Sequence, residues 1–181
     1  MPSKSKIKGS AFEREMAKFL SEKYDESFVR VPNSGAYIGG KNQKRTDVLS
    51  EGQIRAFKGD IIPPDDWIYF NSEAKSYADF QFHALMTPGY IPILESWINQ
   101  TMEVAEEKDL NILFMKFNRK GKYIGFEKKI LDQGLEMTNH NIYQSENHGK
   151  WVFVGEEEFW EKATEVVQII STEGYYNQGY Y

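Results

Sequence analysis

The chain has 181 residues, of which 40% are hydrophobic, 27% charged and 15% aromatic, a composition typical of one globular domain rather than a disordered, collagen-like or coiled-coil chain. The absence of cysteine excludes disulfide scaffolds, thiolate zinc sites and cysteine nucleophiles, and three histidines leave little material for a histidine-rich metal site. No apolar run approaches the roughly 20 residues of a membrane-spanning helix, and the basic N-terminus lacks the apolar segment of a secretion signal.

The net charge of −5 is unevenly distributed along the chain. Residues 1–58 carry 12 Lys and Arg against 7 Asp and Glu, a balance of +5, whereas residues 59–181 carry 10 against 20, a balance of −10. Phosphate binding depends on local clusters of Lys and Arg and on the counterions that they displace. The acidic total therefore does not exclude a nucleic-acid partner, because a protein can combine a basic face with an acidic remainder.

The N-terminal third predicts one helix, one short strand and a long loop. Residues 9–24 carry apolar side chains at helical spacing, beginning with Phe12, and predict an amphipathic helix. The stretch SFVRV at 27–31 predicts a strand, which a Pro-Asn-Ser-Gly turn at 32–35 ends. Residues 36–58 contain two adjacent glycines and the polar run KNQKR, and they predict a long loop, which in a compact domain is usually either functional or disordered.

Residues 59–75 predict a β-hairpin, because a Pro-Pro-Asp-Asp turn at 63–66 separates the apolar run GDII from the strand-forming stretch 67–74. The remaining elements are expected, in chain order, as a helix at 93–108, strands at 111–117 and 123–126 that form a hairpin, a strand at 151–154 and a helix at 156–170. This order predicts an α/β protein with a central mixed β-sheet flanked by helices.

The hairpin at 59–75 would bring three chemically active side chains together, namely Asp60, Glu73 and Lys75. Glu73 and Lys75 share one face because side chains repeat every two residues along a strand. Two carboxylates with a neighbouring carbonyl suit Mg²⁺, which retains waters and accepts a phosphate oxygen. A lysine beside the metal can orient or deprotonate a water molecule. The arrangement suits the hydrolysis of phosphodiester bonds.

Four sequence blocks in this order resemble the PD-(D/E)XK nucleases, and among them the archaeal-type Holliday junction resolvases. The blocks are KGSAFERE at 8–15, RVPNSG at 30–35, GDII at 59–62 and EAK at 73–75. The first resembles the helix that supplies an active-site acid, the second a loop that places a serine beside the scissile phosphate, and the last two the halves of the core motif. Gly59 stands where the motif has a proline, and residues 36–58 are longer than the resemblance predicts.

The resemblance implies a restriction-endonuclease-like core at about 8–127 within a single domain spanning 1–181, with a C-terminal strand and helix extension at 128–181. It implies a Mg²⁺-dependent endonuclease, in which Mn²⁺ substitutes, acting on branched DNA as a homodimer without a membrane partner. The cytoplasm of a bacterium, an archaeon or an infected host cell is the expected location, and a phage is one candidate source. The implied catalytic residues are Glu13, Ser34, Asp60, Glu73 and Lys75, and the implied metal ligands are Glu13, Asp60, Glu73 and the carbonyl of Ala74.

Three basic clusters are candidates for contact with DNA phosphates. An N-terminal arm, the long loop and the tip of the hairpin around 116–129 supply Lys4, Lys6, Lys8, Lys41, Lys44, Arg45, Arg119, Lys120 and Lys122. For the cluster at 116–129, a solvated hairpin tip is an equally favoured interpretation.

Several residues have a structural interpretation beside the functional one. Glu13 lies three residues after Ser10, as a capping-box acid would, but we favour the metal site because Phe12 places this face near the core. For Ser34, a contact with the phosphate and an ordinary role in the turn are equally favoured interpretations. Gln100 could face the site from its helix, although an amide of the core or the surface is the favoured interpretation. For the whole chain the alternatives are a restriction-like or DNA-end-processing nuclease and a non-catalytic DNA-binding protein with a degenerate nuclease fold.

Overall fold

The computed structural model describes residues 4–32 and 58–175, with side chains from Gly9 onward in the first of these ranges. The elements in chain order are α1 (Lys4–Tyr24), β1 (Val29–Arg30), β2 (Ile61–Ile62), β3 (Phe70–Tyr77), the 3₁₀ helix η2 (Phe82–Met86), α3 (Pro92–Met102), β4 (Leu110–Phe117), β5 (Gly121–Glu127), the 3₁₀ helix η3 (Lys128–Gln133), β6 (His140–Gln144), β7 (Lys150–Gly155) and α4 (Glu156–Glu173). None of the helices within these ranges is long and apolar enough to cross a bilayer.

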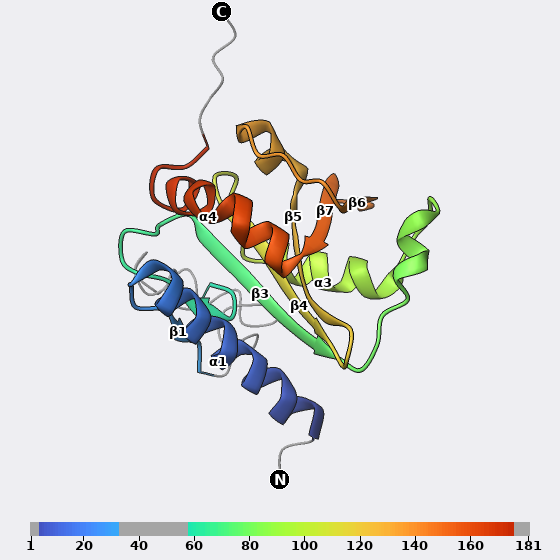
Figure 1. Cartoon of the computed structure of the whole chain (residues 1–181), viewed down its shortest axis with the longest axis horizontal. Helices are drawn as coiled ribbons and strands as arrows, with labels where there is room; N and C mark the ends of the chain where they lie inside the picture. Colours follow the sequence, from blue (N-terminus) through green and yellow to red (C-terminus); the bar gives the residue numbers. More distant parts are fainter. Residues whose placement is uncertain (1–3, 33–57, 176–181) are drawn as a thin grey trace, which may run out of the picture.

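The centre of the molecule is a five-stranded mixed sheet with the order β3-β4-β5-β7-β6 (Figure 1). β3 and β4 run parallel, with Glu73 beside Leu113 and Lys75 beside Met115, and the other neighbours are antiparallel. β1 and β2 form a separate antiparallel pair. The restriction-endonuclease-like α/β fold expected from the sequence is confirmed, and β3, which carries Glu73 and Lys75, is an edge strand of the main sheet.

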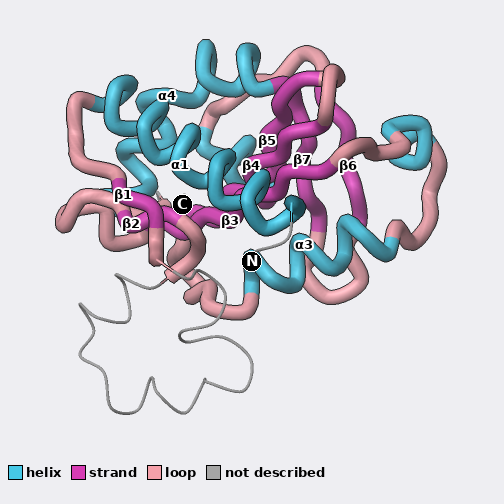
Figure 2. The backbone as a smooth tube through the Cα atoms, turned by 90° about the horizontal axis from the view of Figure 1, so that it is seen from below, coloured by secondary structure: helices cyan, strands magenta, loops and turns pink. Residues whose placement is uncertain are grey.

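Helices cover both faces of this sheet. α1 and α4 lie on one face and α3 lies on the other (Figure 2). Under α1 and α4, Phe12 and Met16 pack in one buried cluster with Phe114 of β4. Under α3, Trp97 packs with Met115 of β4 in a second buried cluster. Full burial of a large apolar side chain contributes about 1.5–3 kcal/mol, so these two layers hold β3 and β4 between them.

The N-terminal helix begins earlier than the sequence predicts. Helical backbone starts at Lys4, so Ser10 and Glu13 lie inside α1 and the predicted capping box is wrong. The backbone at 4–8 forms the first turns of α1 rather than a separate basic arm. The structural interpretation of Glu13 as a helix cap is thereby excluded.

The predicted hairpin at 59–75 is also wrong. β2 pairs with β1, with Ile61 beside Arg30, and it does not continue into β3. Proline has no backbone N–H to donate to a neighbouring strand, so Pro63 and Pro64 do not extend β2. Two tight turns follow them, and in the first of these turns the Trp67 N–H donates to Pro64 O at 3.0 Å. β3 therefore begins only at Phe70. The hairpin of β4 and β5 is confirmed.

The edge strand β6 was missed because its residues are mostly polar and exposed. Its buried side chain, Tyr143, donates its hydroxyl proton to Glu95 of α3 at 2.7 Å. Ser145 donates to the second oxygen of Glu95 at 2.9 Å. A buried carboxylate whose oxygens both accept hydrogen bonds is a stable anchor, so polar contacts rather than apolar alternation hold this strand.

Candidate functional site

Asp60 lies against the free edge of β3, although the hairpin that was expected to bring it there does not exist. The Asp60 N–H donates to Ser72 O at 2.8 Å, and the Ala74 N–H donates to Asp60 Oδ2 at 2.8 Å. Asp60 is buried, with 4% of its surface exposed. Backbone groups on the free edge of a sheet otherwise lack hydrogen-bond partners. Here Ser72 O binds the backbone of Asp60, and the Ala74 N–H binds its carboxylate.

Gly59 makes this close approach possible. Its backbone has a φ of +68°, a conformation that glycine adopts without steric cost. A Cβ at this position would lie 2.2 Å from Ser72 O, far inside any normal contact. The glycine that replaces the proline of the family motif is therefore required where the chain passes β3.

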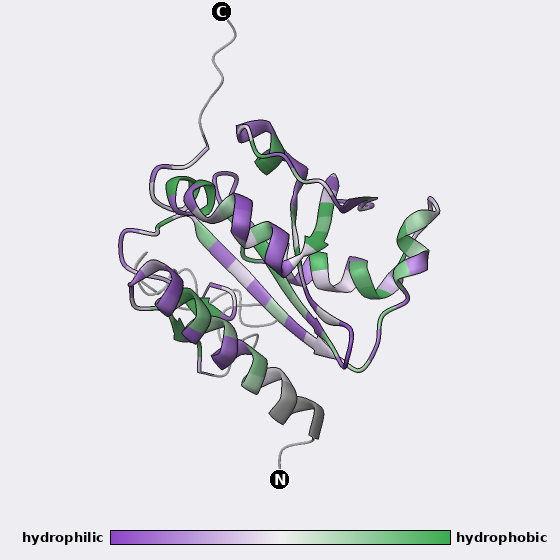
Figure 3. Cartoon of the chain, viewed as in Figure 1, coloured by the Kyte–Doolittle hydropathy of each residue, from purple (hydrophilic) through white to green (hydrophobic). Residues whose placement is uncertain are grey.

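Glu73 and Lys75 extend from β3 on the face that α3 covers. Lys75 Nζ donates to Glu73 Oε1 at 2.6 Å and to Gln100 Oε1 of α3 at 2.5 Å. Hydrophilic residues recur along β3 between less polar ones (Figure 3), and Phe70 and Ala74 of the same strand pack in the buried cluster under α1 and α4. The structure thus places the exposed side chain of Gln100 in contact with Lys75, and whether this amide serves the site stays a prediction.

Burial raises the pKa of Glu73 to about 8, and the nearby carboxylate of Asp60 acts in the same direction. Lys75 opposes this change through its charge and its hydrogen bond. When two buried carboxyl groups are neighbours, their negative charges repel each other, so both ionise readily only if a cation lies between them. The pair therefore has the electrostatic character of a cation-binding site.

The carbonyl of Ala74 lies on the same edge of β3 as Asp60. The N–H and C=O of one strand residue point to the same side, and the Ala74 N–H is the group that contacts Asp60. Two carboxylates and a carbonyl are ligands that Mg²⁺ and Mn²⁺ accept, and Mg²⁺ needs no more than one or two carboxylates besides water and phosphate. Asp60, Glu73 and Ala74 could therefore hold such an ion. No group of three or more His, Asp or Glu side chains suited to a metal occurs within 4–32 and 58–175.

Glu13 of α1 contacts Arg30 of β1, and no group of three metal-ligating side chains joins it to Asp60 and Glu73 within the described residues. The Glu13 carboxylate forms an ion pair and hydrogen bond with Arg30 Nε, and both side chains are largely buried. Arg30 pairs with Ile61, and the next residue, Val31, donates its N–H to Asp60 O at 2.9 Å. The only sequence signal for Arg30 is its position in the block RVPNSG, which also holds the predicted serine.

The remaining predicted residues are placed as follows. Ser34, Lys41, Lys44 and Arg45 lie outside the described residues, as do the side chains of Lys4, Lys6 and Lys8. At the tip between β4 and β5, Arg119 is exposed. Lys120 Nζ lies 2.5 Å from Asp79 Oδ1, and Lys122 Nζ lies 3.0 Å from Glu15 and 3.2 Å from Glu156. Of the three cations at the tip, Lys120 and Lys122 thus have acidic neighbours.

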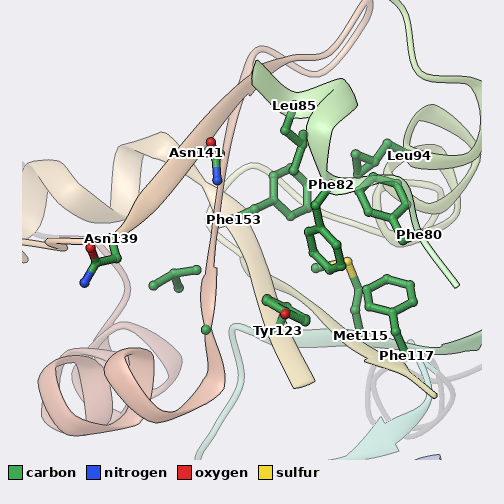
Figure 4. A pocket seen from close by; sticks show the side chains of 12 residues that line it. Phe80, Phe82, Leu85, Leu94, Met115, Phe117, Tyr123, Asn139, Asn141 and Phe153 are labelled. Carbon is green, nitrogen blue, oxygen red and sulfur yellow. The ribbon is translucent and has the colours of Figure 1, made fainter. Parts of the chain in front are cut away.

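A separate small pocket lies between η2 and the sheet (Figure 4). Its volume is about 80 Å³, and its lining is mainly aromatic and aliphatic, including Phe82, Tyr123 and Phe153, with two asparagines. Ligand pockets usually measure roughly 300–1,000 Å³, and none of the lining residues is charged. This pocket offers no group for phosphate chemistry, and the candidate site remains at the edge of β3.

The fold and the site together define a class of protein. An edge strand with a Glu-x-Lys sequence lies beside an aspartate held on its free edge, so the structure brings together the two sequence blocks that resemble the halves of the PD-(D/E)XK core motif. A scan against family models matches residues 4–171 to the family described as phage putative PDDEXK endonuclease. The chain therefore belongs to this family of nucleases, and the match extends past residue 127 through β6, β7 and most of α4. Comparisons with curated proteins and with solved structures gave no match.

Proposed function

We propose that this protein is a Mg²⁺-dependent endodeoxyribonuclease that hydrolyses phosphodiester bonds in branched DNA. The observation that carries the proposal is the convergence of Asp60, Glu73 and Lys75 at the free edge of β3. Membership of a family of nucleases supports the class of reaction. The preference for branched DNA rests on the resemblance of the four sequence blocks to the Holliday junction resolvases.

Asp60, Glu73 and the Ala74 carbonyl are the proposed metal ligands. A bound Mg²⁺ would lower the pKa of a water ligand and neutralise charge that develops on the phosphate. The backbone bond from Ala74 to Asp60 Oδ2 fixes the aspartate before any substrate arrives. A fixed carboxylate supports catalysis because it needs no reorganisation when charge develops.

Lys75 is the proposed residue that orients the attacking water. Gln100 accepts a hydrogen bond from the Lys75 ammonium at 2.5 Å, and Glu73 accepts another at 2.6 Å. An ammonium group has three protons to donate. Two of these are used by Gln100 and Glu73, so the third can be directed at a water or at a phosphate oxygen.

Glu13 and Ser34 complete the proposed site. Glu13 lies next to Arg30, which pairs with the strand directly after Asp60. Glu13 is proposed to act through a second metal or a water, and Ser34 is proposed to contact the scissile phosphate. The cations proposed to contact the DNA backbone are Lys4, Lys6, Lys8, Lys41, Lys44, Arg45, Arg119, Lys120 and Lys122.

A homodimer is proposed because a branched junction has two symmetric strands and needs two symmetric cuts. Sedimentation of the purified chain tests this part directly. A species of twice the chain mass at micromolar concentration supports paired cutting, and a monomer contradicts it.

The test of the proposed function is cleavage of three DNA substrates by one protein preparation. A four-way junction, a linear duplex and a single strand are each incubated with Mg²⁺, with Mn²⁺ and with EDTA. Paired nicks in the junction alone, abolished by EDTA, support the proposal. Cutting of the duplex or its ends instead favours a restriction-like or end-processing nuclease. Binding without cutting in either metal favours a non-catalytic DNA-binding protein.

A matched pair of variants assigns any cutting to this site. Asp60→Asn removes the proposed ligand, and Asp66→Asn changes an exposed aspartate of the following turn. Loss of cutting in the first variant alone assigns the activity to Asp60. Equal cutting by both variants removes Asp60 from the site.

A further inference from the structure

Lys58 and Asp109 form a buried ion pair that the proposed function does not use. The exposed fractions of the two residues are 4% and 1%, and Lys58 Nζ contacts Asp109 Oδ2 directly. A second acid, Glu106, has its Oε1 4.0 Å from Lys58 Nζ. Lysine is almost never buried this fully unless it is paired, so the position of Lys58 depends on Asp109.

Asp109 is itself held from three directions. It stands directly before β4, and its Oδ2 also accepts the Glu106 N–H at 2.6 Å. Its carbonyl accepts hydrogen bonds from Asn111 Nδ2 and from the Tyr175 hydroxyl, each at 3.3 Å. Tyr175 follows α4, so the C-terminal segment helps to fix the loop that anchors Lys58.

Stability alone gives a poor explanation of this pair. Removing two charges from water costs several kcal/mol per ion, and an apolar pair of similar volume is often at least as stable. The second carboxylate oxygen of Asp109, Oδ1, is buried without a hydrogen-bond partner among the described residues. The pair is therefore incompletely compensated, and a role in fixing a position accounts for it better.

The position that it fixes is that of residues 58–60. Lys58 is followed by Gly59, whose backbone passes β3 without room for a Cβ, and then by Asp60. Asp60 is bound to Ser72 O and to the Ala74 N–H. This short segment is thus tied to the start of β4 at one end and to the edge of β3 at the other.

We propose that Lys58 is a positioning residue whose buried ion pair with Asp109 sets the place of the Asp60 carboxylate at the edge of β3. The functional meaning of this place rests on the proposed function, in which Asp60 is a metal ligand. The structural part of the proposal does not, because the Asp60 and Ala74 amides report the position of the segment without any metal.

The experiment compares the full-length wild type with three variants. Lys58→Met removes the cation, and the double change Lys58→Met/Asp109→Leu removes both charges, so that a folded protein is obtained even if the single variant fails to fold. The matched control is Lys128→Met/Asp132→Leu, which removes an exposed pair with an N–O distance of 3.7 Å. Amide hydrogen exchange is followed residue by residue by NMR in EDTA, and Mn²⁺ affinity is measured in parallel.

We expect the Asp60 and Ala74 amides to exchange at least about tenfold faster in the double variant, while amides of β4 and β5 keep wild-type rates. We expect Mn²⁺ affinity to fall about 10–100-fold, as on loss of a group that orients a ligand. The control should match the wild type in both measurements. An unchanged thermal midpoint with faster exchange at these two amides separates positioning from a general loss of stability.

Wild-type protection of the Asp60 and Ala74 amides in the folded double variant would overturn the proposal. Unchanged Mn²⁺ affinity in that variant would overturn it equally, provided that the wild type binds Mn²⁺. If the wild type neither binds Mn²⁺ nor cuts DNA, the proposed function fails, and the amide exchange rates still decide whether Lys58 positions Asp60.

Discussion

Replacement of Gly59 by alanine should destabilise the protein through two separable effects. The first is the positive φ of +68°, which costs a residue with a Cβ roughly 1–2 kcal/mol. The second is the contact of the new Cβ with Ser72 O at 2.2 Å. The oxygen belongs to the backbone of β3, which is paired with β4 along its whole length and cannot move away easily.

The turn rather than β3 must therefore shift. The shift lengthens the two 2.8 Å hydrogen bonds that hold Asp60 to Ser72 and Ala74, each of which contributes about 1 kcal/mol. We expect Gly59→Ala to lower the free energy of unfolding by about 3–4 kcal/mol in total. A displacement of Asp60 by about 1 Å should also lower the rate of DNA cleavage by about 100-fold.

Gly149 provides a matched control. Its φ is +67°, and a Cβ there would meet no atom within 4 Å. Gly149→Ala should therefore lose only about 1–2 kcal/mol and retain cleavage. Urea unfolding of the wild type and both variants measures the two costs. Equal losses in the two variants, with wild-type cleavage by Gly59→Ala, would refute the close approach of Gly59 to β3.

Further predictions concern the pH dependence, the amide and the basic segment of the site. The pKa of Glu73 is raised from 4.5 to about 8, so the folded protein retains a proton that the unfolded chain loses; in EDTA the free energy of unfolding should fall by about 3–4 kcal/mol as the pH rises from 5 to 8. Glu73→Gln should lack this fall in urea titrations, and an equal fall in both proteins would contradict the assignment. Gln100→Ala removes one acceptor of Lys75 and should slow cleavage about tenfold at an unchanged Mg²⁺ midpoint; a shifted midpoint would instead make Gln100 part of the metal site. Replacing Lys41, Lys44 and Arg45 together by alanine should lower the slope of log Kd for DNA against log salt concentration by up to about 3. An unaltered slope would exclude contact between these three side chains and DNA.

The chemistry of the site was predictable from the sequence to a greater extent than its geometry. Asp60, Glu73 and Lys75 were selected because carboxylates and an amine at this spacing suit one reaction. The strand pairing that was expected to unite them was wrong, since β2 pairs with β1. Asp60 instead lies beside β3 because the backbone of Gly59 passes close to this strand. The positive φ of Gly59 could not be predicted from the sequence, in which only the glycine itself indicates it.

The ion-pair partners of charged residues could not be predicted from the sequence, because the sequence gives the charge of a side chain but not whether the side chain is buried. Arginine and lysine usually lie on the surface of a protein. Here Arg30 binds Glu13, and Lys58 binds Asp109. Both contacts join segments that are distant in the chain. β6 was missed for a related reason, since the buried carboxylate of Glu95 rather than apolar alternation holds it.

The segment after residue 127 contributes to both the main sheet and the layer of helices above it. β7 lies between β5 and β6 in the main sheet, and α4 packs beside α1 over the core. The Tyr69 N–H donates to Ser171 O at 2.9 Å, which joins the end of α4 to the residue directly before β3. The region after residue 127 therefore supports the strand that carries Glu73 and Lys75.

Metal binding is the most direct test of the account. Mn²⁺ is titrated into the purified wild type and into Asp60→Asn at pH 8, with free Mn²⁺ followed by its electron paramagnetic resonance signal. We predict that the wild type binds Mn²⁺, that Mg²⁺ competes for the same site, and that Asp60→Asn binds at least about 100-fold more weakly. Equal affinity of the two proteins for Mn²⁺ would contradict a metal site formed by Asp60 and Glu73 at the edge of β3.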